Sequence, residues 1–388
     1  MSVIPGRWTN PLRRRRDAIP DDAADELTTT KEELAYASQW RLMWLKFKRH
    51  KLALIGLFGI IGLYLMMAFN GFLAPYAPEQ RMEFTYSPPN GLHFFRDGKI
   101  DPYVNGLTLK SDPETMTRVV TRDTSQQFDV KFFAHGPEYE LFGFIPTTIH
   151  LMQPEEGGYL FFFGTDSLGR DIYSRTLSGS TISLSIGLVG VAISFVLGAV
   201  IGGFSGFYGG GFDTVTQRLI EFLIVIPTIP LWLALSAAIP ADWGPLKVYF
   251  GITIILSIVG WTGIARVVRG KLLQVREEDF VLDAQLAGAS DWRIVIVHML
   301  PAFSSYLIVQ LTLAVPAIIL AETALSFLGL GLRPPIVSWG VLIQDAQNVQ
   351  SILLYPWLLI PGAFVVFTVL CFSFFGDGLR DAADPYKT

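Results

Sequence analysis

The sequence predicts an all-α polytopic membrane protein with six transmembrane helices, both termini in the cytosol, and a small extracytoplasmic domain between the first two spans. Composition is the first indication, because hydrophobic residues make up 51% of the 388 residues and charged residues only 16%, against about 25% charged in soluble proteins. Apolar runs close to the roughly 20 residues that a spanning helix needs are the second. Lys and Arg beside alternate runs are the third, because they indicate which ends face the cytosol.

Six apolar runs are long enough to cross a bilayer as helices. Proline lies inside several of them, but neighbouring helices can satisfy the backbone groups that proline frees, so we expect kinked helices. The predicted spans are 52–73, 181–212, 222–241, 248–265, 302–321 and 353–376.

Basic residues set the predicted orientation. Four arginines at 13–16 and further basic residues precede the first run, which predicts a cytosolic N-terminus. Six crossings return the C-terminus to the same side, and the loop 266–301 between the fourth and fifth spans is then cytosolic as well. We expect no cleavable signal peptide, since a long polar segment precedes the first apolar run. The basic residues of the loop are Arg266, Arg269, Lys271, Arg276 and Arg293.

The parts outside the bundle differ in composition. Residues 1–30, rich in Pro, Asp, Thr and Arg, predict a disordered cytosolic tail. Residues 31–51 place aromatic and basic residues at helical spacing, which is typical of an amphipathic helix in the membrane interface or of an extension of the first span. Residues 74–163 contain turn signals and alternating apolar residues, so we expect a small β-rich extracytoplasmic domain there.

Several kinds of chemistry find no support in the sequence. There is no Gly-x-x-x-x-Gly-Lys-Ser/Thr loop for ATP and no run of Cys and His with metal spacing, so we expect no cofactor. The net charge of −4 gives no reason to expect nucleic acid. Residues 203–206 have the Gly-x-Ser-Gly form of rhomboid-type intramembrane hydrolases, but Ser205 would need a base and no histidine lies within a predicted span. A closely packed helix end is the favoured interpretation.

Two carboxylates lie at or within predicted spans, where charge is unfavourable and usually functional. Glu221 follows Arg218 by three residues, so the two can pair on one helix face. Glu322 lies late in the fifth span. Each could serve a translocation path or a proton relay, or could fix the bundle by hydrogen bonds. The structural interpretation is favoured for Glu221, and both stay open for Glu322.

The loop 266–301 resembles the signature of ABC-importer permeases, which reads Glu-Ala-Ala, three residues, Gly, nine residues, Ile-x-Leu-Pro. The spacing fits without gaps when Gly288 is the glycine and Pro301 the final proline. The departures from the pattern are Leu282, Asp283 and His298.

Local residue types suit such an element. We expect a short helix from about Glu277, a tight bend at Gly288, and Asp291 as the cap of a second helix running to His298. The resemblance implies that this element seats on a partner ATPase. The residues expected to take part in coupling are Asp283, Ala284, Gly288, Ala289, Asp291, His298, Leu300 and Pro301.

Further segments are similar to the oligopeptide/dipeptide permeases, in particular to their C subunits. Residues 164–388 thereby resemble a five-helix permease core, with the coupling loop at 266–301. The insertion 74–163 is longer than this resemblance explains. The similar segments are 164–171 (Gly-Thr-Asp-Ser-Leu-Gly-Arg-Asp), 322–331 (Glu-Thr-Ala-Leu-Ser-Phe-Leu-Gly-Leu-Gly) and 376–382 (Gly-Asp-Gly-Leu-Arg-Asp-Ala).

The resemblance implies a transport subunit, not an enzyme, of an ATP-driven importer in the bacterial inner membrane. The implied partners are a homologous permease subunit, two cytosolic ABC ATPases and a periplasmic substrate-binding protein. The implied substrates are oligopeptides or dipeptides, with oligosaccharides or a metal chelate as alternatives because relatives import them. An ion-coupled secondary transporter is a more distant alternative, since the sequence contains neither internal repeats nor midplane ionisable clusters.

Overall fold

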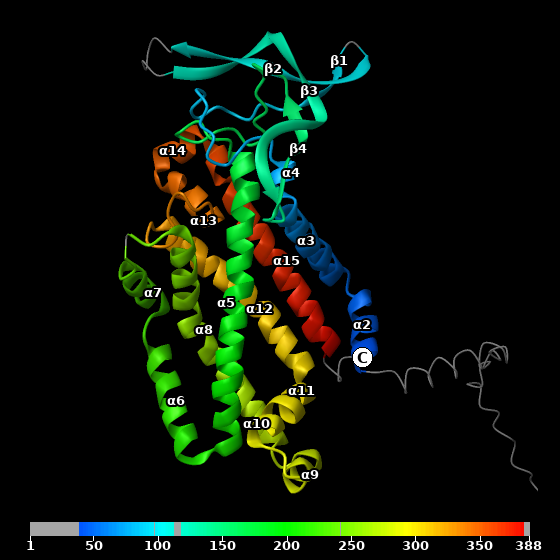
Figure 1. Cartoon of the computed structure of the whole chain (residues 1–388), viewed down its shortest axis with the longest axis vertical. Helices are drawn as coiled ribbons and strands as arrows, with labels where there is room; N and C mark the ends of the chain where they lie inside the picture. Colours follow the sequence, from blue (N-terminus) through cyan, green and yellow to red (C-terminus); the bar gives the residue numbers. More distant parts are fainter. Residues whose placement is uncertain (1–38, 97, 112–117, 241, 384–388) are drawn as a thin grey trace, which may run out of the picture.

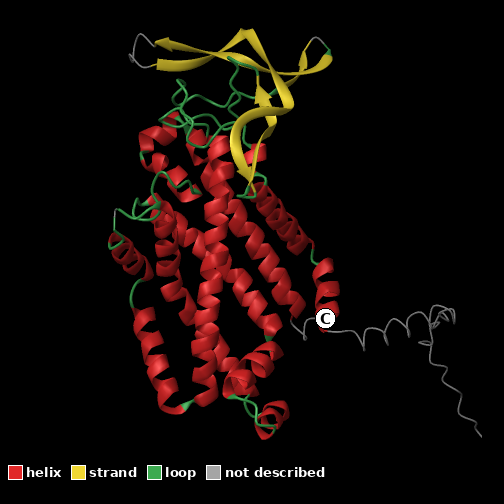
Figure 2. Ribbon diagram, viewed as in Figure 1, coloured by secondary structure: helices red, strands yellow, loops and turns green. Residues whose placement is uncertain are grey.

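The computed structural model describes residues 39–96, 98–111, 118–240 and 242–383. Long helices lie side by side in one bundle, a β-sheet lies at one end, and a small helical projection marks the other end (Figure 2). The predicted tail 1–30, and residues 31–38 of the predicted interfacial helix, lie outside the described residues.

Among the described residues, five helices are long and apolar enough to cross a membrane, and a sixth span results if the bent pair α6–α7 counts as one. The prediction of a helical polytopic bundle is confirmed at this level. A 3-10 turn, Pro356–Leu359, extends the last of these helices at its start. The five helices are α3 (Lys51–Ala68), α5 (Ile172–Tyr208), α8 (Pro245–Val275), α12 (Ser304–Phe327) and α15 (Ile360–Ala383).

The third predicted span, 222–241, is not one straight helix. α6 (Gly210–Val225) and α7 (Thr228–Ala237) meet at 87°. The break falls at Ile226, whose backbone is extended (φ −72°, ψ 125°), and at Pro227. Proline disfavours the helical conformation in the residue before it and supplies no N–H for the helix, so the chain bends there.

The class all-α holds for the bundle but not for the whole chain, because residues 74–163 include a four-stranded antiparallel sheet of order β1-β2-β3-β4. A β-rich region was expected in this segment. Two apolar clusters stabilise it, one containing Phe161 and one containing Leu160, both fully buried. The strands are β1 (His93–Arg96), β2 (Lys99–Ser111), β3 (Arg118–Leu141) and β4 (Ile145–Pro154).

Helix α5 runs through the bundle and packs closely on α8 (Figure 1). A Cβ added at Gly202 would lie 2.3 Å from the Ala265 carbonyl oxygen, and one added at Gly206 would lie 2.8 Å from another carbonyl oxygen of α8. Small residues permit such approach in membranes, where helix association depends on packing. α12 contacts α5 as well. α5 therefore positions α8 and α12, the two helices that flank the loop 266–301.

Short elements connect the long helices. α2 (Gln39–Arg49) overlaps the predicted interfacial helix 31–51, whose place in the membrane stays a prediction. His50 follows it and caps α3, since its Nδ1 accepts a hydrogen bond from Ala53 N–H (3.1 Å). The other short elements are α4 (Asn70–Leu73), α9 (Asp279–Leu286), α10 (Asp291–Arg293), a π-helix (Ile294–Met299), α11 (Leu300–Ala302), α13 (Trp339–Leu342), a 3-10 helix (Ile343–Gln347) and α14 (Val349–Leu354).

Candidate functional site

The loop between α8 and α12 forms a helix, a tight turn and a second helical segment at the end of the bundle opposite the sheet (Figure 1). After α9, Gly288 N–H donates to Gln285 O (2.9 Å) and Ala289 N–H donates to Ala284 O (3.0 Å). These two bonds form a Schellman motif, which places Gly288 in the left-handed region at φ +77°. The expected short helix and the bend at Gly288 are both confirmed.

The second helical segment is capped differently from the prediction. Ser290 occupies the N-cap position and Asp291 is the first helical residue, so the expected cap at Asp291 is wrong. The Asp291 carboxylate instead accepts a hydrogen bond from the Tyr208 hydroxyl (2.8 Å) at the end of α5. The segment then continues through the π-helix Ile294–Met299 and α11 into a kink at Phe303.

One face of this element is anchored in the protein. Val281 of α9 is fully buried in an apolar cluster that includes side chains of α5, α8, the π-helix and α12. Among the residues predicted from sequence, Ala284 and Ala289 pack against this cluster, Leu300 is buried within it, and His298 is half-buried. The buried members are Ala199, Ile264, Val268, Leu272, Val281, Ile294, Val295, Met299, Leu300 and Leu307.

The opposite face is exposed and partly apolar. Leu286 is 87% exposed, Trp292 54% and Leu282 44%. Asp283 and Gly288 are exposed between them, and a Cβ at Gly288 would meet no atom of this chain within 4 Å. Apolar side chains gathered on an otherwise polar projection indicate a surface for another protein. Pro301 is also exposed, next to the anchored side.

A carboxylate of α6 joins three helices beside this loop. Arg269 of α8 donates two hydrogen bonds of 2.5 Å to Asp213, and Ser205 of α5 donates a third of 2.5 Å. The side chains of Arg269 and Asp213 are only 29% and 15% exposed. Ser205, considered above for hydrolase chemistry, also accepts a hydrogen bond from Gln217 (3.3 Å). Displacing any one of α5, α6 and α8 would therefore strain contacts with the other two.

The two carboxylates singled out from the sequence lie in different surroundings. Glu221 accepts a hydrogen bond from Arg218 (2.7 Å), and their side chains are 60% and 78% exposed, so the expected pair is confirmed. Glu322 is fully buried, and its Oε1 accepts hydrogen bonds from Ser326 Oγ and Ser338 Oγ, each 2.8 Å long. The bond from Ser338 joins α12 to the segment after it, and the two bonds together favour the structural interpretation of Glu322.

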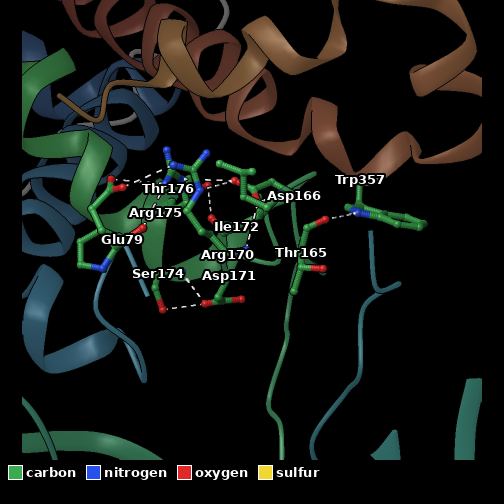
Figure 3. A network of polar contacts seen from close by, with 12 residues as sticks. Glu79, Thr165, Asp166, Arg170, Asp171, Ile172, Ser174, Arg175, Thr176 and Trp357 are labelled. Atoms are coloured by element: carbon green, nitrogen blue, oxygen red, sulfur yellow. Dashed lines mark hydrogen bonds and ion pairs between the residues drawn. The ribbon is translucent and has the colours of Figure 1, made fainter. Parts of the chain in front are cut away.

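The motif at 164–171 forms a buried polar network where α5 begins (Figure 3). Asp166 accepts hydrogen bonds from Arg170 Nε (2.7 Å) and from two backbone N–H groups. Arg170 and Arg175 both reach the Glu79 carboxylate, at 3.3 and 3.4 Å. The buried cations are thereby paired, as low-dielectric surroundings require, and they tie α5 to the chain that follows α4.

Asp171 caps α5 within the same network (Figure 3). Its Oδ2 accepts hydrogen bonds from Ser174 N–H (2.7 Å) and Ser174 Oγ (2.6 Å), and burial raises the pKa of Asp171 to about 7. The Trp357 indole donates to Thr165 O (3.1 Å) and brings the last span to the motif. The helix accordingly begins at Ile172, before the predicted residue 181.

Sequence reasoning named this motif but not its partners. Its partners Glu79 and Trp357 lie far from it in the chain, so no local spacing connects them. The separate Asp213–Arg269 pair was missed for the same reason. The one available signal was the presence of Arg175 and Arg269 in helices that are otherwise apolar, since a cation there needs a partner.

Several known proteins are similar to this chain in sequence. Residues 166–387 match the family described as the binding-protein-dependent transport system inner membrane component, and residues 38–89 match the N-terminal TM domain of oligopeptide transport permease C. The dipeptide transport system permease protein DppC of Bacillus subtilis (strain 168) is 40% identical over 226 residues, which are 58% of this chain and 68% of that protein.

Two further relatives extend the comparison. DppC of Lactococcus lactis subsp. cremoris is 32% identical over 343 residues, 88% of this chain and 89% of that protein. The oligopeptide transport system permease protein OppC of Haemophilus influenzae is 37% identical over 261 residues, 66% of this chain and 81% of that protein. The first family match covers more than half of the chain and includes the whole loop between α8 and α12. The chain therefore belongs to the family of binding-protein-dependent transport system inner membrane components.

Proposed function

We propose that this chain is a permease subunit of an ATP-driven importer, which moves oligopeptides or dipeptides delivered by an extracytoplasmic binding protein across the bacterial inner membrane. The family match supports the permease role. Relatives named as dipeptide and oligopeptide permeases support peptides as the substrate class. The N-terminus and the loop 266–301 lie in the cytosol, as their basic residues indicate, and the sheet lies on the other side.

The working assembly contains a homologous permease subunit, two cytosolic ATPases and the binding protein. One observation carries the ATPase assignment: the α9–Gly288–α10 element has a rigid anchored face and an exposed apolar face at the end opposite the sheet. Because Leu282 and Asp283 replace the usual Glu-Ala, docking depends on Asp283, Gly288 and the exposed apolar side chains.

Movement passes from this element to the bundle by three routes. The buried cluster around Val281 connects α9 to α8, α12 and α5. Tyr208 connects the second segment to α5, and Arg269 connects α8 to α6 through Asp213. ATP binding and release by the partners would favour different positions of α9, and the bundle would switch between inward-open and outward-open states through these contacts.

A matched pair of glycine variants tests the docking assignment. Gly288→Trp should abolish co-purification with the ATPases while the protein stays inserted, because a large side chain would project from the docking face. Gly98→Trp is the control, since Gly98 has nearly the same backbone (φ +79°), is equally unobstructed, and lies in the turn between β1 and β2. Equal ATPase recovery with both variants would show that docking occurs elsewhere.

A further inference from the structure

The β3–β4 hairpin ends in an apolar tip, residues 141–146, which lies beside the end of α3 (Figure 1). It reads Leu-Phe-Gly-Phe-Ile-Pro and contains no charge. Phe144 is 72% exposed, Phe142 49% and Ile145 43%. Tight hairpin turns usually place Asn, Asp or Gly where φ is positive; here Gly143 (φ +81°) fills one such position and Phe142 the other. Phe142 has φ +57°, a conformation that a bulky side chain rarely adopts, so water alone does not account for this tip.

Contacts with the helix end hold the tip in place. The rings of Phe142 and Phe69 lie 5.4 Å apart, and those of Phe133 and Phe72 lie 6.0 Å apart. Further up the hairpin, His150 Nδ1 lies 2.6 Å from the carbonyl oxygen of Ala74. The height of the tip relative to α3 is therefore fixed by packing and hydrogen bonding.

The tip continues an apolar surface of α3. α3 is the least buried of the five long apolar helices, because only 17% of its apolar stretch is buried inside the protein. An open groove of about 450 Å³ lies on α3 and α4 just below the tip. Exposed apolar side chains repeat every three or four residues along one side of α3, at Leu52, Ile55, Phe58, Ile61, Leu65 and Phe69. The groove is lined by Gly62, Leu65, Met66, Phe69, Phe72 and Leu73.

The length of α3 sets the depth of the tip in a bilayer. Its 18 residues, Lys51–Ala68, rise about 27 Å at 1.5 Å per residue, and the hydrocarbon core of a bilayer is about 30 Å thick. With Lys51 at one boundary, Phe69 falls at the opposite boundary, and any tilt places it deeper. Phe142, in ring contact with Phe69, lies at the same level.

We propose that the hairpin tip 141–146 and the α3–α4 groove together form a lipid-binding surface, with Phe142 and Phe144 inserted at the hydrocarbon boundary and an acyl chain in the groove. Lipid fits this surface because it continues the uncharged exposed stripe of α3 and lies at the level of the hydrocarbon boundary. Exposed Glu138 and Glu140 flank the tip at the headgroup level. This contact anchors the sheet domain, residues 74–163, to the membrane beside the bundle. That role goes beyond transport itself.

Site-directed spin labelling tests the proposal on the full chain in liposomes of phosphatidylethanolamine and phosphatidylglycerol. The single cysteine, buried Cys371, is changed to Ser, and a nitroxide is attached after Phe144→Cys. Ile100→Cys, on an 80% exposed position elsewhere in the sheet, is the aqueous control. Phe58→Cys, on a 68% exposed position within α3, is the lipid control. Power saturation then compares the accessibility of each label to oxygen and to a water-soluble nickel chelate.

A label at 144 that resembles the one at 58, with high oxygen and low nickel accessibility, supports the proposal. A label at 144 that is as accessible to nickel as the one at 100 overturns it, because the tip would then lie in water. An immobilised label shielded from both reagents also overturns it, because a protein would then cover the tip. Hydrogen exchange of the sheet in each labelled protein checks that the hairpin remains folded.

Discussion

Replacing Arg269 by Met breaks the contact in which α5, α6 and α8 meet. The variant loses two 2.5 Å hydrogen bonds to Asp213 but keeps an apolar side chain in the same place. Hydrogen bonds to charged groups contribute about 1.5–3 kcal/mol, and an unpaired buried charge costs about 3–5 kcal/mol. Because Asp213 is 15% exposed and keeps Ser205 as a partner, we expect a loss of about 2–4 kcal/mol in the free energy of unfolding.

A second ion pair on α6 is the matched control. Arg218 and Glu221 are 78% and 60% exposed, so Arg218→Met should change the free energy of unfolding by only about 0–1 kcal/mol. Both variants are measured by equilibrium unfolding of the purified chain in mixed micelles, followed by far-UV circular dichroism. If Arg269→Met destabilises the chain no more than Arg218→Met, the reasoning about the three-helix contact is refuted.

Other contacts lead to three further predictions. Gly202→Ala should lower the free energy of unfolding by about 1–3 kcal/mol, because the added Cβ would lie 2.3 Å from the Ala265 carbonyl oxygen. Gly270→Ala is the control: its Cβ would meet no atom within 4 Å, so it should be neutral or stabilising by up to about 1 kcal/mol. Equal effects of the two variants would contradict close α5–α8 packing. The raised pKa of Asp171, about 7, means that between about pH 4 and pH 7 the folded state holds a proton that the unfolded state has lost. Stability should therefore fall as pH rises through this window, and a thermal-melting series in which Asp171→Asn keeps the full slope would refute the assignment. Glu322→Gln keeps an oxygen that can accept from both serines, so uptake should remain normal; loss of uptake in a folded variant would indicate that the charge itself is used.

Hydropathy and local turn chemistry predicted much of this structure. The apolar runs located the long apolar helices approximately, and the glycine at 288 with its preceding helix located the turn of the candidate docking element, because both signals depend on neighbouring residues alone. The β-rich character of 74–163 was also expected, although its register was not, since strand pairing depends on residues far apart in the chain.

The errors arose where distant contacts outweigh local preference. α5 begins at Ile172, where Asp171 caps it, and Arg175 can lie in its first turns because Glu79 pairs with this charge, which hydropathy counts against a span. Asp291 bonds to Tyr208 from α5 and so does not cap its own helix. The third predicted span breaks at Pro227, which is exposed. Pro316, by contrast, stays within α12 among buried neighbours.

Uptake by reconstituted complexes tests the transport assignment most directly. The chain would be co-purified with its permease partner and ATPases, placed in liposomes, and supplied with its binding protein and a labelled dipeptide or oligopeptide. We expect uptake that requires ATP on the side of the loop 266–301 and binding protein on the side of the sheet, and that persists when ion gradients are collapsed. Peptide uptake driven by an ion gradient without the ATPases would contradict the assignment.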